Sequence, residues 1–224
     1  MVVQASGIKK SYGDLDVLKG VDIEVYKGEI VTIVGASGAG KSTLLHIVST
    51  LDLPDSGSIT INGKETANLS SKQLSRFRNS HIGFIFQFHH LLPEFSALEN
   101  VCIPGWIGKY NKKTVEEKAK GLLELLGLSG RLHHKPGELS GGEQQRVAVA
   151  RALVNDPAIV FADEPSGNLD SHHAREMHEL FFTLRKNLDQ TFLIVTHNDD
   201  LAAMSDRKII MKDGLMVQDE PAQG

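Results

Sequence analysis

Residues 35–42, GASGAGKS, have the types and spacing needed to hold a chain of phosphate groups. They match the P-loop pattern G-x-x-x-x-G-K-[ST] and directly follow the apolar run 30–34. Glycines let successive backbone N–H groups turn toward the β- and γ-phosphates, Lys41 adds a positive charge, and the Ser42 hydroxyl suits Mg²⁺. Because every fixed position and both flanking elements match, a flexible glycine turn without a ligand is disfavoured. The predicted phosphate-binding residues are Gly35, Ser37, Gly38, Ala39, Gly40, Lys41, Ser42 and Thr43.

Two acidic residues, Asp163 and Glu164, come directly after a second apolar run, 158–162. A carboxylate at the end of a buried strand beside a P-loop is suited to Mg²⁺, and we assign that role to Asp163. Glu164 is predicted to point toward the γ-phosphate and to orient or deprotonate the attacking water. Alone, Asp-Glu-Pro would indicate only a turn that ends a strand; beside a P-loop, the catalytic interpretation is favoured.

A second device for binding anions is predicted at residues 139–145, LSGGEQQ. Ser140 and Glu143 have the spacing of a capping box, and a helical run follows. Gly141 and Gly142 leave the start of that helix uncovered, so its N–H groups and dipole can receive an anion. A capped helix after a glycine pair is usually only a helix start, but its presence beside the other two motifs makes it specific.

The composition excludes several classes of function. At roughly 150 residues per domain, 224 residues predict one or two domains. The formal charge of −4, with no basic block, argues against a nucleic-acid partner. Eighteen consecutive apolar residues occur nowhere, and the first residues lack the apolar core of a signal peptide, so we expect the chain to stay in the cytoplasm. The single cysteine, Cys102, cannot form an internal disulfide.

Hydrophobic patterning predicts an α/β fold with two kinds of strand. Alternating residues at 21–25 and 58–64 indicate a small antiparallel β region near the N-terminus. The apolar runs 30–34, 158–162 and 192–196 indicate a buried, mostly parallel sheet with crossover helices. The run 208–217 is predicted to form a hairpin about Asp213-Gly214.

Two amphipathic helices are predicted in the second half of the chain. The first has a possible capping box at Thr114 and Glu117 and ends at Gly127, and the second begins at Asp170 or Ser171. Their apolar stripes are Val115, Ala119, Leu122 and Leu126, and Ala174, Met177, Phe181, Leu184 and Leu188. The chain is therefore predicted to be a single domain, 1–224, in which a P-loop NTPase core (1–87 and 156–224) carries a helical satellite subdomain (88–155).

The three motifs together resemble the nucleotide-binding subunits of ATP-binding cassette transporters, and the resemblance covers residues 5–217. It implies that Tyr12 stacks on adenine, that Gln87 senses Mg²⁺ and the membrane partner, and that His197 contacts the γ-phosphate. The loop 166–170 resembles the segment that crosses the dimer interface, which gives Asp170 a place near the nucleotide. Plainer interpretations remain open for each. They are an edge aromatic for Tyr12, a polar residue at a strand end for Gln87, a helix cap for Asp170, and a helix cap or a satisfied histidine for His197.

The family architecture implies a head-to-tail homodimer with two ATP sites. In it, Lys41 and Glu164 of one subunit face Ser140, Gly141 and Gly142 of the other across ATP and Mg²⁺. Two inner-membrane permease subunits would dock near residues 87–92, which places the chain peripherally on the cytoplasmic face of the bacterial inner membrane.

Residues 83–101, including FHHLLP, resemble the ATPase subunits of bacterial lipoprotein-releasing systems. The resemblance implies that lipoprotein is contacted through the permease. Subunits of macrolide-efflux type or of a cell-division complex that regulates a periplasmic hydrolase are the alternatives, and a DNA-acting cassette or a small-molecule kinase fits less well. The histidine pairs at 89–90, 133–134 and 172–173 are not predicted to bind metal, because adjacent side chains diverge.

Overall fold

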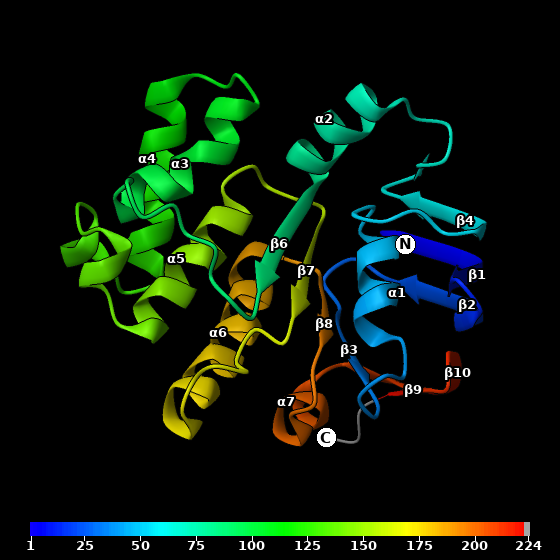
Figure 1. The fold of residues 1–224 in the computed structure, drawn as a ribbon. Coiled ribbons are helices and arrows are strands. Elements are labelled where there is room, and N and C mark those ends of the chain that lie inside the picture. Colours follow the sequence, from blue (N-terminus) through cyan, green and yellow to red (C-terminus); the bar gives the residue numbers. More distant parts are fainter. Residues whose placement is uncertain (222–224) are drawn as a thin grey trace.

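Two β-sheets organise the protein, and the computed structural model describes them over residues 1–221 (Figure 1). The first sheet is antiparallel, with the strand order β2-β1-β4-β5. Its strands are β1 (Val3–Tyr12), β2 (Leu15–Val25), β4 (Ser56–Ile61) and β5 (Lys64–Glu65). The antiparallel region predicted near the N-terminus is therefore confirmed.

The second sheet has the order β10-β9-β3-β8-β7-β6 and is parallel except at the edge strand β10. Its strands are β3 (Ile30–Val34), β6 (Ile82–Phe86), β7 (Ile159–Asp163), β8 (Phe192–Val195), β9 (Arg207–Lys212) and β10 (Leu215–Pro221). The three apolar runs singled out in the sequence are the neighbours β3, β8 and β7, and the hairpin turn at Asp213-Gly214 is confirmed.

The helices cover both faces of the parallel sheet. They are α1 (Lys41–Val48), α2 (Ser71–His81), α3 (Ala97–Ile107), α4 (Lys112–Leu125), α5 (Gly141–Leu153), α6 (Ser171–Leu188) and α7 (Asp199–Met204), with 3₁₀ turns at Ser129–Arg131 and Pro136–Glu138. Figure 1 shows α3, α4 and α5 together on the left, with α1 on the far side of the sheet.

The apolar side chains of the parallel sheet are shared between two cores. Val31 and Ile33 of β3 belong to the core that includes α1 and the antiparallel sheet, whereas Ile30 and Val160 face the core built with α3 to α6. A strand buried on both faces needs apolar residues at every position. This requirement explains why β3 is apolar on both faces instead of alternating, apart from Thr32, whose buried hydroxyl lies 2.9 Å from that of Ser205.

The helix ends correct one prediction and confirm two. Helix α4 is capped by Asn111, whose side chain accepts from the Thr114 N–H, so the predicted Thr114–Glu117 capping box is wrong. Asparagine is as good an N-cap as serine or threonine, and it stands one turn earlier. Gly127 has a φ of 72° just beyond the helix, as expected of a C-terminal glycine. Asp170 caps α6.

The apolar stripe of α6 is buried except at its last member. Ala174, Met177, Phe181 and Leu184 are buried, but Leu188 is 46% exposed because the helix ends there. Among residues 1–221, the helices are all too short or too polar to cross a lipid bilayer.

Replacing Phe181 by alanine should lower the free energy of unfolding by about 3–5 kcal/mol, because it opens a cavity where the ring packs against Phe192. Phe181 is fully buried, and its ring centroid lies 5.2 Å from that of Phe192. Urea denaturation measures the change, with Leu188→Ala as the control on the same helix. A loss no larger than that of the control would contradict the packing described.

Candidate functional site

The P-loop joins β3 to α1 and requires glycine at two positions. Gly35 has a φ of 149°, and a side chain there would collide with the carbonyl of Met211. Gly40 has a φ of 96°, and an added Cβ would lie 2.9 Å from the Val17 carbonyl oxygen. The backbone thus makes a turn that other residues resist before α1 begins at Lys41.

Lys41 points into its own loop. Its Nζ donates to the carbonyl oxygens of Gly35 (2.8 Å) and Ala36 (3.0 Å). The ammonium group therefore sits on the concave side of the P-loop, where a bound phosphate would meet it. An incoming phosphate oxygen would replace the two carbonyl partners.

Ser42 and Asp163 are brought together from distant parts of the sequence. The Ser42 hydroxyl donates to Asp163 Oδ1 at 3.1 Å, and Asp163 is the last residue of β7. Burial raises the pKa of the Asp163 carboxyl, although the hydrogen bond from Ser42 opposes this. A hydroxyl and a carboxylate side by side form the kind of hard oxygen pair that suits Mg²⁺.

Glu164 and His197 form a second pair at the same edge. His197 Nδ1 lies 2.8 Å from Glu164 Oε2, and the His197 backbone N–H donates to the same oxygen at 3.3 Å. Glu164 adopts a φ of 46°, uncommon for a residue other than glycine, and its N–H donates to the carbonyl of Val195. The backbone is held in this strained conformation by β8, and strain of this kind is typical of active sites.

The capping box predicted at the start of α5 is present, but the prediction that both glycines leave this helix start uncovered is wrong, because Gly142 is buried beside the His173 ring. Ser140 is the N-cap, and its hydroxyl accepts from the Glu143 N–H at 3.2 Å. In turn, the Glu143 carboxylate accepts from the Ser140 N–H at 2.8 Å. Arg131 holds the Glu143 carboxylate at 2.8 Å. Figure 1 shows α5 and α1 on opposite sides of β7 and β8, so one chain does not bring this site to its own P-loop.

The loop between β7 and α6 is tied to its surroundings at three points. Asn168 and Gln87 exchange two hydrogen bonds of 3.0 Å, so the Gln87 amide is engaged by Asn168 and not by the Ser42–Asp163 pair. The Ser166 hydroxyl bonds the buried His178 ring at 3.0 Å. Asp170, besides capping α6, pairs with His173 Nδ1 at 2.7 Å.

Gln145 joins two of these elements and was missed by sequence analysis. Its side-chain amide, only 1% exposed, donates to the carbonyls of Phe86 and Pro165. These carbonyls directly precede Gln87 and directly follow Glu164, respectively. The available signal was a polar residue on the otherwise apolar buried face of α5, since a buried amide must find partners.

Tyr12 lies at the end of β1, 53% exposed. Its hydroxyl donates to Asp52 Oδ2 at 2.8 Å, and Lys10 Nζ stands 5.2 Å from the ring centroid while also pairing with Asp52. Hydrogen bonding to Asp52 is the main cause that raises the pKa of Tyr12. The ring is thus fixed at one edge and has a face open to solvent.

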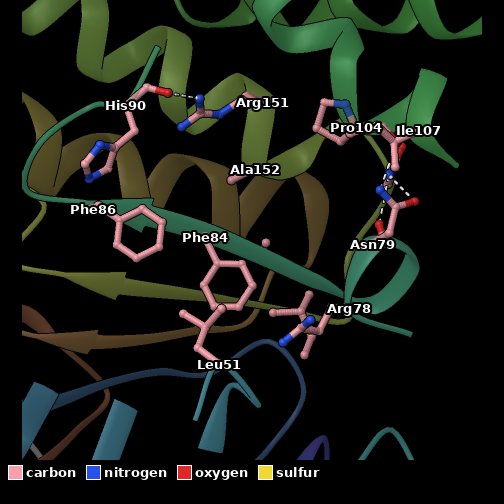
Figure 2. Close-up of a pocket in the computed structure, with 13 residues that line it drawn as sticks. Leu51, Arg78, Asn79, Phe84, Phe86, His90, Pro104, Ile107, Arg151 and Ala152 are labelled. Carbon is pink, nitrogen blue, oxygen red and sulfur yellow. Dashed lines mark hydrogen bonds between the residues drawn. The ribbon is translucent and has the colours of Figure 1, made fainter. Parts of the chain in front are cut away.

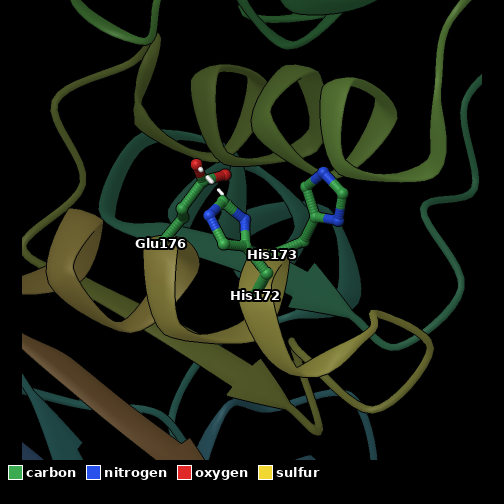
Figure 3. A group of neighbouring side chains, drawn as sticks. All are labelled: His172, His173 and Glu176. Carbon is green, nitrogen blue, oxygen red and sulfur yellow. Dashed lines mark ion pairs between the residues drawn. The ribbon is translucent and has the colours of Figure 1, made fainter.

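One of the histidine pairs is more clustered than expected. Potential ligand atoms of His172, His173 and Glu176 lie within 4.8 Å of one another, in the first turns of α6 (Figure 3). Each already has a partner of its own: Glu176 pairs with Arg146 (3.7 Å) and with His172 (3.7 Å), and His173 pairs with Asp170. The guanidinium of Arg146 would repel a metal ion, so these three residues are better described as part of an ion-pair network between α5 and α6.

Known proteins match the chain over almost its whole length. Residues 18–167 match the family model described as ABC transporter. A lipoprotein-releasing system ATP-binding protein, LolD, from Cytophaga hutchinsonii is 62% identical over 216 residues, which are 96% of this chain and 99% of the relative. A protein of the same name from Bacteroides thetaiotaomicron is 56% identical over 97% of this chain and all of the relative.

Two solved structures share the fold. The dimeric ATP-binding cassette MJ0796, in a post-hydrolysis state bound to ADP and Pi, has a TM-score of 0.88 and 36% identity and covers 99% of both chains. The cassette cbiO1 from Clostridium perfringens, part of the ABC transporter complex cbiONQ, has a TM-score of 0.90 and 28% identity, covering 99% of this chain and 88% of its own. The α/β fold with an antiparallel N-terminal sheet is thus shared with known cassettes.

His178→Gln should make the fold less sensitive to acid. Burial lowers the pKa of His178 below its ordinary 6.5, while Asp200 opposes this shift. The unfolded chain therefore takes up the proton first, so the free energy of unfolding falls as the pH drops from 6.5 toward the lower pKa of the folded state. Urea denaturation at about pH 7.5 and about pH 5.5 should show a smaller difference for the variant than for the wild type. Equal differences would mean that His178 does not contribute.

Proposed function

Because this chain belongs to the ABC transporter family of ATP-binding proteins, we propose that it is the ATP-hydrolysing subunit of a system that releases lipoproteins from a bacterial inner membrane toward the outer membrane. The observation that carries the proposal is 62% identity over 96% of the chain to a lipoprotein-releasing system ATP-binding protein. Residues 83–101 resemble the same group, and the exposed or partly exposed part of this segment, residues 88–95, includes Phe88, which is 65% exposed.

Lys41 and the backbone N–H groups of residues 35–43 hold the β- and γ-phosphates in this proposal. Ser42 and Asp163 supply oxygen ligands to Mg²⁺, which offsets phosphate charge when bound. Gln87, predicted as a further ligand, joins them only after it releases Asn168.

Glu164 is the residue that handles the attacking water. One of its oxygens, Oε2, accepts from the backbone and ring of His197, which leaves Oε1 to accept a hydrogen bond from water in line with the γ-phosphate. With Nδ1 directed at Glu164, the other ring nitrogen of His197 is available to the γ-phosphate. Water adds to the phosphorus, the bond to the β-phosphate oxygen breaks, and ADP and phosphate leave.

In this proposal, a second copy of the chain completes each nucleotide-binding site. Helix α5, which begins at Gly141, lies across the sheet from α1, so we propose a head-to-tail homodimer in which Ser140, Gly141 and Gly142 reach the partner's γ-phosphate. Tyr12 stacks on adenine, and Asp170 lies at the interface between copies. The dimeric cassette MJ0796, at 36% identity, supports this arrangement.

Two permease subunits dock near residues 87–92 on the cytoplasmic face of the membrane, and lipoprotein is contacted through them. The helical part, residues 88–155, links that surface to Ser140, Gly141 and Gly142 at the dimer interface. Exposed Phe88 and Leu92 give this surface the apolar character that a protein partner covers.

Glu164→Gln should bind ATP but hydrolyse it at least about 10²-fold more slowly, because the amide cannot accept the proton of the attacking water. The trapped ATP should then hold the dimer together, and light scattering with ATP and Mg²⁺ should report twice the mass of one chain. Ser140→Arg added to this variant should restore the monomer while keeping ATP binding. A monomer in the Glu164→Gln variant itself would contradict the sandwich.

The transport role is tested by detergent purification of the Glu164→Gln protein with ATP from membranes of the native host. The proposal expects recovery of membrane subunits with few membrane helices and a large periplasmic domain, carrying lipoprotein. In reconstituted proteoliposomes, ATP should release lipoprotein with the wild type and not with the variant. Recovery of an efflux adaptor or of division proteins would overturn the lipoprotein assignment while keeping the ATPase.

A further inference from the structure

The Tyr12 ring is held by a carboxylate from a different part of the chain. Its hydroxyl donates to Asp52 Oδ2 at 2.8 Å, although Tyr12 itself is 53% exposed. This hydrogen bond is the main cause that lowers the pKa of Asp52 below its ordinary value, so the acceptor is ionised at neutral pH. An exposed tyrosine otherwise exchanges rapidly between rotamers, and a hydrogen bond to an ionised carboxylate is strong enough to restrict that motion.

Lys10 joins the carboxylate and the ring. Its Nζ lies 3.2 Å from Asp52 Oδ2 and 5.2 Å from the centroid of the Tyr12 ring, and its side chain is only 12% exposed. It also donates to the Leu53 carbonyl at 2.7 Å, so its own position is fixed. A cation over one face of a tyrosine ring is attracted to that face, so a nucleobase would stack on the opposite one.

The loop that carries Asp52 is bonded to α1, the helix that follows the P-loop. The backbone N–H groups of Leu51 and Asp52 both donate to the carbonyl of His46 in α1, at 2.8 and 3.1 Å. Arg78 Nη1 donates to the Thr50 carbonyl at 2.8 Å, and Leu51 lines the same groove as Arg78 (Figure 2). The position of the Asp52 carboxylate is therefore set by the helix that also begins at the phosphate-binding turn.

Charge alone would not favour an acid at this place. ATP is a polyanion, so a nearby carboxylate opposes its binding, and Lys10 offsets both Asp52 (3.2 Å) and Asp55 (4.0 Å) only in part. Asp55 has a local structural role, because its Oδ2 accepts from the Ser11 N–H at 2.7 Å. Asp52 Oδ2 accepts from the Tyr12 hydroxyl instead, which points to a role in holding the ring.

We propose that Asp52 is a positioning residue for nucleotide binding, and that together with Lys10 it fixes the Tyr12 ring so that a purine base stacks on the face opposite Lys10. This role rests on the function proposed above and adds a residue to it. Because the Asp52 loop is bonded to α1, the ring and the P-loop keep a fixed relation, and ATP binds without having to order the ring first.

Isothermal titration calorimetry of the full-length chain with ATP and Mg²⁺ provides the test. Asp52→Ala should raise the Kd for ATP about three- to tenfold, because binding then has to order a free ring. Loss of a negative charge near a polyanion acts in the opposite direction, so charge alone cannot weaken the complex. Tripolyphosphate, which has no base, should bind the variant at least as tightly as the wild type.

A double-mutant cycle distinguishes positioning from a general structural effect. Tyr12→Phe, which lacks the hydroxyl, should raise the Kd for ATP by a similar factor, and Asp52→Ala added to it should change the Kd by less than about twofold more. Asp52→Asn keeps an acceptor for the hydroxyl and should lose less affinity than Asp52→Ala. Asp14→Ala is the matched control, because Asp14 is an exposed acid in the turn after β1, and it should not weaken binding.

Steady-state hydrolysis provides a second measurement. Asp52→Ala should raise the KM for ATP and leave kcat within about twofold of the wild type, because Asp52 acts on the base and not on the reacting phosphate. A fall in kcat with an unchanged KM would contradict the positioning role.

The possible failures are distinguishable. If the wild type does not bind ATP, the proposed function fails, and if Tyr12→Ala binds ATP as the wild type does, the stacking role of Tyr12 fails. If Tyr12→Ala weakens binding but Asp52→Ala, with an unchanged thermal unfolding midpoint, does not, only the role of Asp52 is overturned. Equal weakening of ATP and tripolyphosphate by Asp52→Ala would overturn it as well. Should Asp52→Ala fold poorly, wild-type ATP affinity in Tyr12→Phe would overturn the proposal.

Discussion

The parallel register of β3, β7 and β8 is the constraint on which the site depends. Thr32 pairs with Ile194 and Asp163 with Val195, so the three strands end at the same level. The next residue of each chain segment then falls at one edge, which is where the P-loop, Glu164 and His197 lie. These groups are about 30 to 160 residues apart in sequence, and no local interaction could assemble them.

Helix α5 is the second organising element, because its two ends serve different surfaces. Its capped start presents residues 140–142, and Gln145 in the next turn fixes the ends of β6 and β7. Arg151 near its end donates to the carbonyls of His89 and His90. A movement of α5 would therefore alter Gln87 and Glu164 together. Buried amide and guanidinium groups suit this task, since their hydrogen bonds are directional and costly to leave unmade.

The sequence was sufficient for the features that depend on local chemistry. The P-loop, the capping box at Ser140, the apolar strands of the parallel sheet and the turn at Gly214 all have short patterns with a direct physical cause. Helix α2, with its Ser70–Gln73 capping box, had a comparable signal that was not used. The polar residue Gln145 on the buried face of α5 was a usable signal, but its partners and those of Arg151 could not be predicted, because backbone carbonyls carry no sequence signature.

Almost every group assigned to the nucleotide is already satisfied by another group of the protein. Lys41 bonds its own loop, Ser42 bonds Asp163, Glu164 bonds His197 and Gln87 bonds Asn168. ATP binding in this site is therefore an exchange of hydrogen bonds, in which the net gain is much smaller than the gross strength of the new contacts. Such a balance makes occupancy sensitive to modest contributions from elsewhere, such as the second copy of the chain and the membrane subunit that we propose.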